Sequence, residues 1–421
     1  MRRLISGALA LLIAHFAASA LEAQTLSVEQ YTLQAKALLN QPQVTAAFNH
    51  IDRTRDEVLR EWTELTEINA PSGQEKERAL YIEKLLRRSP NLQDIHYDAA
   101  GNLIAVRKGT GGGPTVVIDA HMDTVFQPGT QIRATVRDGT IHAPGIGDDT
   151  RNIEAMLATM RALDAAQIKT KGDLIFAFTV EEETTFRGVK QFVKDHKGKV
   201  NYYIALDGGY EGFTYGGVGI NWYRHHFIGP GGHTRSRTPP YSATLPLARA
   251  ISRIYELKVP TSPSSNLNIG MLGGSDVVNA KAADAWFTVD LRSTSNEVIS
   301  DLEKRISAIL KEEADRVGMT VRTEVISTTP ASQIPGFRDS DLVRQTEAVH
   351  LALGFANPPI TPTASNHSNV ALNNGIPAIS TGAAPCTGAH ALTEACEIEP
   401  FYKGIKKILL LEVMLAQLSA K

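Results

Sequence analysis

The sequence predicts an α/β protein built on a mostly parallel sheet and interrupted by a smaller α+β unit. In the first half, short apolar runs that fit buried strands alternate with helical patterns, as in parallel sheets. Between residues 214 and 331 the pattern changes to strand-helix-strand-strand-helix-strand, the ferredoxin-like order. The alternating pattern then resumes. We therefore expect one domain over residues 45–213 and 332–421, with 214–331 inserted into it.

Length and composition bound the class of protein. The 421 residues allow two domains or one domain with a large insertion, and 43% hydrophobic with 21% charged residues is a globular composition. Residues 1–20 have the parts of a secretory signal peptide, namely Arg2 and Arg3, the apolar stretch Leu4–Ala17 and the small-residue site Ala18–Ala20. An uncleaved anchor is the alternative, but the stretch is short for a membrane span. We expect an exported protein, periplasmic or secreted, that keeps no membrane segment after cleavage.

Charge and cysteine usage narrow the expectation further. The formal charge is −2 and no concentrated basic run is present, so nothing indicates a nucleic-acid partner. The only two cysteines, Cys386 and Cys396, flank His390. In an exported protein they can oxidise, and the bond would close a small loop around that histidine. Two buried thiols that never meet are the alternative, because spacing alone does not settle bond geometry.

The first predicted elements are helices. Residues 21–44 are polar and only weakly patterned. Ser72 followed by Glu75 fits a capping box, which predicts a helix that runs to about Arg88. The helix before it ends at Ala70–Gly73 and has apolar residues near helical spacing, which are Ile51, Val58, Leu59, Trp62 and Leu65.

The sheet elements follow. The glycine-rich Gly109–Gly113 predicts a turn between two strands, because neither Lys-Ser/Thr nor a helix follows it, as a phosphate-binding loop requires. The predicted strands are Asn102–Arg107, Thr115–Ala120, Asp173–Val180, Tyr202–Leu206 and Pro377–Thr381. The predicted helices are Asp149–Ala166 and a closing one from about Phe401 to Leu418.

Six elements make up the predicted insertion. Four are strands and two are helices, in the order Val218–Ile228, Ala243–Leu257, Asn266–Leu272, Ala283–Leu291, Glu297–Val317 and Thr320–Ile326. Within Trp286–Arg292, Phe287, Val289 and Leu291 alternate with polar residues. One face of this strand is therefore expected to pack on the helices, and the other to look outward.

Acidic and histidine side chains follow the ends of the predicted strands. The string HMDT places His121 and Asp123 directly after one strand, Glu181–Glu183 follow a second and Asp207 follows a third. If these strands are parallel, their carboxyl ends share one edge of the sheet. Asp148 and Asp149 at a helix start, and His390 after a late strand, complete the set. Each signal alone is weak, but together they predict a metal site, and imidazole with carboxylate suits Zn, Co or Mn.

The motifs as a set resemble the co-catalytic di-zinc exopeptidases and deacylases, the family of peptidase T, carboxypeptidase G, aminoacylase and succinyl-diaminopimelate desuccinylase. The landmarks run from about Ile51 to the C-terminus: APSGQE, YDAAGNL, HMDTV, GDD, EEE, ALDGG, GPGGH, GMLGGSDVVNAKAADAWFTVDLRS, NGIPAISTG and AHALTE. FT-x-x-EE followed by ALDGG looks most like the peptidase T branch. The resemblance implies a zinc-peptidase catalytic domain and an inserted ferredoxin-like lid that serves for dimerisation.

The resemblance also implies two Zn²⁺ ions, with Co²⁺ or Mn²⁺ as possible substitutes. Its implied ligands are His121 and Asp207 for one ion, Asp148 as the bridge between both, and Glu183 and His390 for the other. The residues alone leave two questions open. Glu181 and Glu182 could be the base and ligand instead of Glu182 and Glu183, and Asp149 could be the bridge instead of Asp148. The order usual in the family favours Glu182 with Glu183, and Asp148.

Two catalytic roles are implied next to these ligands. Glu182 resembles the general base, which takes a proton from the water between the metals and passes it to the leaving amine. Asp123 resembles the partner that orients His121, because metal-bound imidazoles usually need such a group.

The insertion is expected to add further groups. His233 in GPGGH resembles a histidine that reaches into the partner's site and stabilises the oxyanion. Arg292 and Asn279 resemble lid residues that hold the substrate carboxylate, and a surface salt bridge is the alternative for Arg292. The resemblance therefore implies a homodimer formed through the lid.

Two stretches depart from the family pattern. Thr150–Asn152 stands where relatives often have Lys-Gly-Gly or Lys-Ala-Gly, and Ser365–Asn369 where they often have Thr-Asp or Ser-Asp. Both are expected near the substrate pocket, where His367 is either a pocket contact or a hydrogen-bonded loop histidine.

The resemblance thus implies a metallopeptidase that trims short peptides. An N-acyl amino acid deacylase of the same family is the alternative, since pocket shape separates the two. A non-catalytic binding protein is a third possibility. The presence of all five implied ligands and of the base argues against it.

Overall fold

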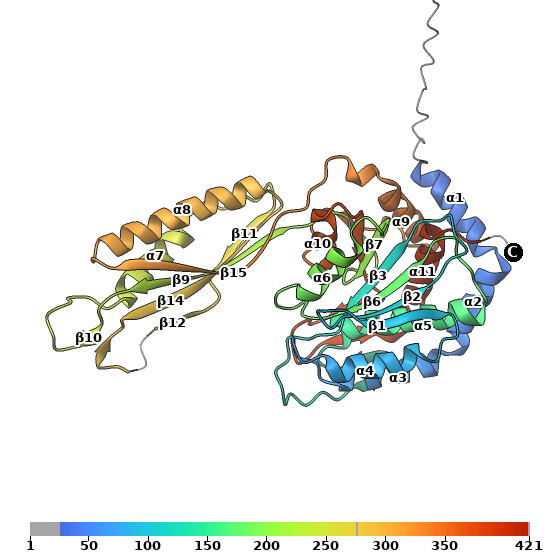
Figure 1. Cartoon of the computed structure of the whole chain (residues 1–421), viewed down its shortest axis with the longest axis horizontal. Coiled ribbons are helices and arrows are strands. Elements are labelled where there is room, and N and C mark those ends of the chain that lie inside the picture. Colours follow the sequence, from blue (N-terminus) through green and yellow to red (C-terminus); the bar gives the residue numbers. More distant parts are fainter. Residues whose placement is uncertain (1–25, 275–276, 420–421) are drawn as a thin grey trace, which may run out of the picture.

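The computed structural model describes residues 26–274 and 277–419. The predicted signal peptide lies outside these residues. The chain forms a larger unit with a central sheet and a smaller unit that extends away from it (Figure 1). Within the described ranges, no helix has the length and apolarity needed to cross a bilayer.

An eight-stranded sheet forms the centre of the larger unit, and it confirms the predicted α/β class. Strands β6, β3, β7 and β17 are neighbours and run parallel, whereas β1 and β2 join one side in antiparallel fashion. In spatial order the strands are β1 (Leu92–Tyr97), β2 (Leu103–Arg107), β6 (Leu174–Thr179), β3 (Val116–His121), β7 (Tyr202–Leu206), β17 (Ala378–Thr381), β8 (Phe213–Thr214) and β16 (Ile360–Thr361). Every residue of β2, β3 and β6 is buried, as strands covered on both faces require.

Helices cover this sheet. The helix α5 packs on β3 and against α11, α2 and α3, while α10 packs on β7, β17 and α6. The helices of this unit are α1 (Val28–Leu39), α2 (Pro42–Arg53), α3 (Arg55–Glu67), α4 (Lys76–Leu86), α5 (Arg151–Ala165), α6 (Arg187–His196), α9 (Asp341–Ala352), α10 (His367–Asn373) and α11 (Ile398–Leu415), with the short helices η1 (Ile146–Thr150) and η2 (Phe337–Asp339). Trp62 packs on Phe401 with ring centroids 4.4 Å apart and donates its indole N–H to the Ile146 carbonyl at 3.0 Å. This contact ties α3 to the segment that leads into Asp148.

The weakly patterned stretch before residue 45 is more ordered than expected. Ser27 and Gln30 form a capping box that starts α1, and Tyr31 and Ala35 lie one turn apart on its buried side. The helix α1 packs on α9 and α11. The buried stripe is narrow, since Tyr31 and Ala35 are its buried residues and the apolar Leu33 is exposed, which is why the apolar periodicity is weak.

The capping box expected at Ser72 and Glu75 is wrong. The helix α4 begins at Lys76 without a side-chain cap. The Ser72 hydroxyl donates to Asp123 at 2.6 Å, and the Glu75 carboxylate accepts from the backbone N–H of Gly73 at 2.8 Å. The charge of the Asp123 carboxylate strengthens the bond from Ser72, which holds this side chain away from the start of the helix.

The inserted unit has the predicted ferredoxin-like order. Its antiparallel sheet runs β11 (Ser265–Asn268), β14 (Asp284–Ser293), β9 (Gly219–Ile228) and β15 (Thr320–Thr329), with β12 (Leu272–Gly274) also on β14. Helices α7 (Thr244–Tyr255) and α8 (Asn296–Asp315) cover one face and share a second core with Phe227 and Phe287. Buried and half-buried residues alternate along β14, as its sequence predicts.

Two small features complete the fold. A β-ribbon of β10 (Gly232–His233) and β13 (Ala280–Lys281) lies at the far end of the inserted unit (Figure 1). In the larger unit, a four-stranded sheet joins β18 (Cys386–Thr387), β19 (Ala395–Glu397), β5 (Thr140–His142) and β4 (Thr135–Arg137). Both ends of the described chain, α1 and the end of α11, lie on the side of the larger unit away from the insertion (Figure 1).

Candidate active site

The predicted metal-binding side chains gather at one edge of the parallel strands. His121 is the last residue of β3, and its neighbours β6 and β7 end at Thr179 and Leu206, just before the acidic run and Asp207. Because the three strands are parallel, these residues emerge at the same edge.

Asp148 lies between two histidines. Its Oδ1 is 2.9 Å from His121 Nε2, and its Oδ2 is 3.1 Å from His390 Nε2. His390 Nε2 is also 3.1 Å from Glu183 Oε2. His121, Asp148, His390 and Glu183 thus form a continuous chain, with Asp148 in the position expected of a bridging carboxylate.

The donor atoms are close enough together to hold metal ions. Among the residues that the structure describes, three groups have all their ligand atoms within 4.8 Å of one another: His121 with Asp148 and Asp149, His121 with Glu182 and Glu183, and Asp148 with Glu183 and His390. Glu183 Oε1 is buried without a hydrogen-bond partner among the described residues. A buried unpaired carboxylate oxygen next to imidazoles fits a metal ligand, so this donor set suits the predicted ions.

Asp207 belongs to the same electrostatic environment. Burial, and then Asp148, raises its pKa to about 6. The carboxylates of Asp148 and Glu183 accept hydrogen bonds from His390 and raise its pKa to about 10. Each shift reports acids and imidazoles crowded together, which bound cations would relieve.

Asp123 ties the end of β3 to the acidic run. Its carboxylate accepts the backbone N–H groups of Glu182 at 2.9 Å and Glu183 at 3.1 Å. Its Oδ1 lies 3.4 Å from His121 Nδ1, and its own carbonyl oxygen lies 3.1 Å from the same nitrogen. This position fits the predicted orienting role.

The geometry favours the predicted register of the acidic run. Glu181 turns to the rim, where Arg187 pairs with it at 2.7 Å. Glu182 is buried, 8% exposed, and burial followed by Asp207 raises its pKa well above the ordinary value. Glu183 reaches His390. The Glu182 carboxylate also lies within reach of His121 and Glu183, and its burial and raised pKa fit the predicted general base.

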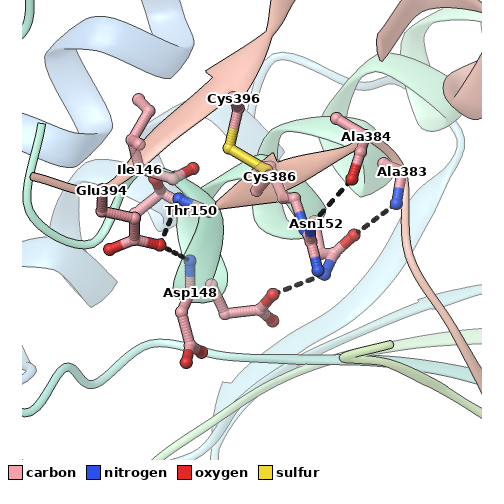
Figure 2. Close-up of a disulfide and its surroundings, with 12 residues drawn as sticks. Ile146, Asp148, Thr150, Asn152, Ala383, Ala384, Cys386, Glu394 and Cys396 are labelled. Carbon is pink, nitrogen blue, oxygen red and sulfur yellow. Dashed lines mark hydrogen bonds between the residues drawn. A yellow bond between two sulfur atoms is a disulfide. The ribbon is translucent and has the colours of Figure 1, made fainter. Parts of the chain in front are cut away.

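Asp149 is occupied in another way. Its carboxylate accepts the backbone N–H of His121 at 3.2 Å and the side-chain amide of Asn152 at 2.5 Å. Asn152 in turn accepts the N–H of Ala383 at 2.9 Å (Figure 2). These bonds favour Asp148 as the bridge and give the unusual Asn152 a supporting place.

The lid residues lie apart from the cluster. His233 is exposed in β10, at the far end of the inserted unit (Figure 1), and Asn279 precedes the paired strand β13. Arg292 lies at the other end of the insertion, near the catalytic unit, where it donates to Asp290 and to the Ser365 hydroxyl at 3.1 Å. Within one chain, the described contacts bring neither His233 nor Asn279 to the metal-binding residues.

His367 is a buried histidine held by an acid. Its Nδ1 is 2.7 Å from Asp119, and its ring centroid is 6.3 Å from that of His121. This arrangement fits the hydrogen-bonded alternative rather than an open pocket contact.

Glu394 is a residue whose role the sequence did not reveal. Its carboxylate accepts three backbone N–H groups, from Gly145 at 2.7 Å, Gly147 at 2.9 Å and Asp148 at 2.8 Å. Figure 2 shows the bond from Asp148. The motif AHALTE contains it, and an acid four residues after a predicted ligand was the available signal. Cys386 and Cys396 form a disulfide beside it.

Comparison with known proteins identifies the family of the chain. A family model described as Peptidase family M20/M25/M40 matches residues 117–411, which include all five predicted ligands. The uncharacterised protein YqjE of Bacillus subtilis is 24% identical over 370 residues, which is 83% of this chain and 96% of that protein. Carboxypeptidase G2 of Pseudomonas sp. is 24% identical over 225 residues, covering 51% of this chain and 54% of its own.

The fold has solved counterparts. The crystal structure of a tripeptidase from Staphylococcus aureus matches with a TM-score of 0.73 at 23% identity and covers 86% of this chain and 99% of that one. The resemblance inferred from the motifs is confirmed, since the family model spans most of the chain. The chain belongs to peptidase family M20/M25/M40 and is a hydrolase of that family.

Proposed function

We propose that this enzyme is a two-metal exopeptidase that hydrolyses amide bonds of short peptides. The observation that carries the proposal is the chain of donors His121, Asp148, His390 and Glu183, with the buried Glu182 beside it. The chain also shares the fold of a tripeptidase structure, which favours peptides as the first substrates to test.

The residues of the chain account for the proton movements of hydrolysis. Two metal ions bound here, zinc in the first instance, would polarise the scissile carbonyl and lower the pKa of the attacking water. Glu182 takes the proton that this water loses as its oxygen joins the carbonyl carbon. Glu182 then gives the proton to the leaving nitrogen as the carbon–nitrogen bond breaks. Asp123 holds both His121 and the backbone of Glu182, so one carboxylate sets the ligand and the base together.

The lid supports a dimeric active site. His233 lies at the far end of the inserted unit, and Arg292 lies where that unit joins the larger one. In a homodimer formed through the lid, His233 would stabilise the oxyanion in the partner's site. Arg292, with Asn279 as a further lid contact, would hold the substrate carboxylate.

The compartment is part of the proposal. The signal peptide predicted at residues 1–20 and the Cys386–Cys396 disulfide both favour an exported enzyme, periplasmic or secreted.

The proposal is tested by hydrolysis of a small substrate panel with purified mature protein and added zinc. The panel holds di- and tripeptides with free amino termini, the same peptides with blocked amino termini, and N-acyl amino acids. We expect cleavage of the free peptides. Cleavage of only the N-acyl compounds would assign the enzyme to the deacylase alternative, and cleavage of none would overturn the proposal.

Mixing two inactive variants tests the shared site. His233→Ala subunits and Glu182→Gln subunits are each expected to be inactive alone. In a heterodimer, one site has an intact Glu182 and receives an intact His233 from its partner, so a random mixture should regain about a quarter of the wild-type activity. Mixing His233→Ala with itself is the control. If the mixture stays inactive while heterodimers are present, His233 does not act across the dimer.

A further inference from the structure

The disulfide closes a loop that carries two groups of the metal site. Cys386 in β18 and Cys396 in β19 lie directly opposite each other in an antiparallel pair, with a sequence separation of 10. The loop between them contains both His390 and Glu394. The disulfide therefore controls how far a predicted ligand and the carboxylate beside it can move.

On one side, the disulfide and Glu394 enclose the backbone in front of Asp148. A Cβ atom placed on Gly147 would lie 2.7 Å from Glu394 Oε1, 2.9 Å from Cys386 Cβ and 3.0 Å from Cys386 Sγ. Only glycine fits there. Because Glu394 also accepts the N–H groups of Gly147 and Asp148, the peptide that bears the bridging carboxylate is clamped from both directions (Figure 2).

On the other side, His390 depends on the loop for its position. Its backbone is left-handed, with φ 66°, a conformation that costs energy for a residue with a Cβ and persists where the surroundings impose it. Its side chain is 54% exposed and meets the carboxylates of Asp148 and Glu183. Little packing holds this imidazole, so the short closed loop is its main restraint.

We propose that the Cys386–Cys396 disulfide is a positioning element for the metal position formed by Asp148, Glu183 and His390, so that reducing it weakens metal binding there. This inference rests on the proposed two-metal function. The position of His121 and Asp207 is less affected, because His121 belongs to β3 and Asp207 directly follows β7, both in the central sheet.

The bond can be opened from one side. Cys396 is 1% exposed, whereas Cys386 is half-buried. A trialkylphosphine that attacks the sulfur of the half-buried Cys386 breaks the sulfur–sulfur bond and releases the Cys396 thiolate. Water then attacks the phosphorus and displaces the Cys386 thiolate, which leaves phosphine oxide. One disulfide, one phosphine and one water thus give two thiols and one phosphine oxide. In an oxidising compartment the bond persists.

The test counts metal ions and measures their affinities in the mature protein. Oxidised protein, phosphine-reduced protein and the Cys386→Ser/Cys396→Ser variant are each titrated with zinc against a chelating indicator. The oxidised form should bind two ions. In the other two forms one ion should bind about 10- to 100-fold more weakly, the usual effect of losing a group that orients a ligand, and the other should change little. The double variant also removes the thiols as new zinc ligands.

Controls keep the outcomes distinct. Phosphine should have no effect on the double variant, and circular dichroism should show that the reduced protein keeps its helices. Glu394→Gln, which keeps the disulfide, should weaken the same position. Two equally tight ions in every form would overturn this inference and leave the proposed function intact. Oxidised protein that binds no metal would overturn the function itself. Loss of both ions together with the helical signal would overturn the local role of the disulfide.

Discussion

Replacing Glu182 with glutamine is expected to lower kcat by about 100- to 10,000-fold, the range that a positioned general base supplies. Glutamine has the same shape, so it keeps the bond from the Glu182 backbone N–H to Asp123 and fills the same buried volume. It has no carboxylate to accept the proton from water. Zinc content and melting temperature should therefore match the wild type, and only turnover should fall.

Glu181→Gln is the matched control. Glu181 is the adjacent acid, and it pairs with Arg187 at the rim. Because an exposed pair contributes little to stability, this variant should keep activity within a few-fold of the wild type. The opposite outcome, an inactive Glu181→Gln with an active Glu182→Gln, would show that the base lies one residue earlier.

Removing the metal ions should abolish hydrolysis and lower the melting temperature. Six buried or half-buried groups face one another here, namely His121, Asp148, Asp149, Glu182, Glu183 and Asp207. Without cations, the cost of burying these charges side by side must be offset by protonation or by hydrogen bonds among them, which destabilises the folded state. Ligand binding to the folded state stabilises it by mass action, by about 4 kcal/mol when the free metal is 1,000 times its Kd.

The measurement compares protein dialysed against a chelator with protein to which zinc is returned. Thermal unfolding and peptide hydrolysis are followed on the same samples, and magnesium at equal concentration is the control because it prefers oxygen ligands. Full activity in protein shown by elemental analysis to be free of metal would refute the proposed chemistry. Recovery of stability without activity would show instead that the metals serve the fold alone.

Much of this site follows from strand ends, which a sequence displays directly. The runs before His121, Glu181 and Asp207 are continuous and apolar, which predicts buried strands, and their alternation with helices predicts a mostly parallel sheet. The alternation of apolar and polar residues along β14 likewise predicted which face of this strand packs inside the inserted unit. These features are local patterns with a fixed period.

The groups that hold the site were harder to foresee, because they depend on contacts between distant segments. Glu394 meets the Asp148 backbone across 246 residues, and no periodicity marks a carboxylate that binds backbone N–H groups. Ser72 showed the converse problem: its spacing to Glu75 fits a local cap, but the fold brings the stronger acceptor Asp123 to it from 51 residues away. Local preference yields to such tertiary contacts.

The placement of the chain ends has a practical consequence. Since α1 and the end of α11 both lie on the side of the larger unit remote from the inserted unit, an affinity tag or surface linkage at either end leaves the lid free to meet another copy (Figure 1). Enzyme coupled sparsely to a bead would be held as isolated single chains. Soluble Glu182→Gln subunits added to such beads would then supply the missing lid. The activity that appears on the beads would measure how many coupled chains have each paired with one soluble subunit.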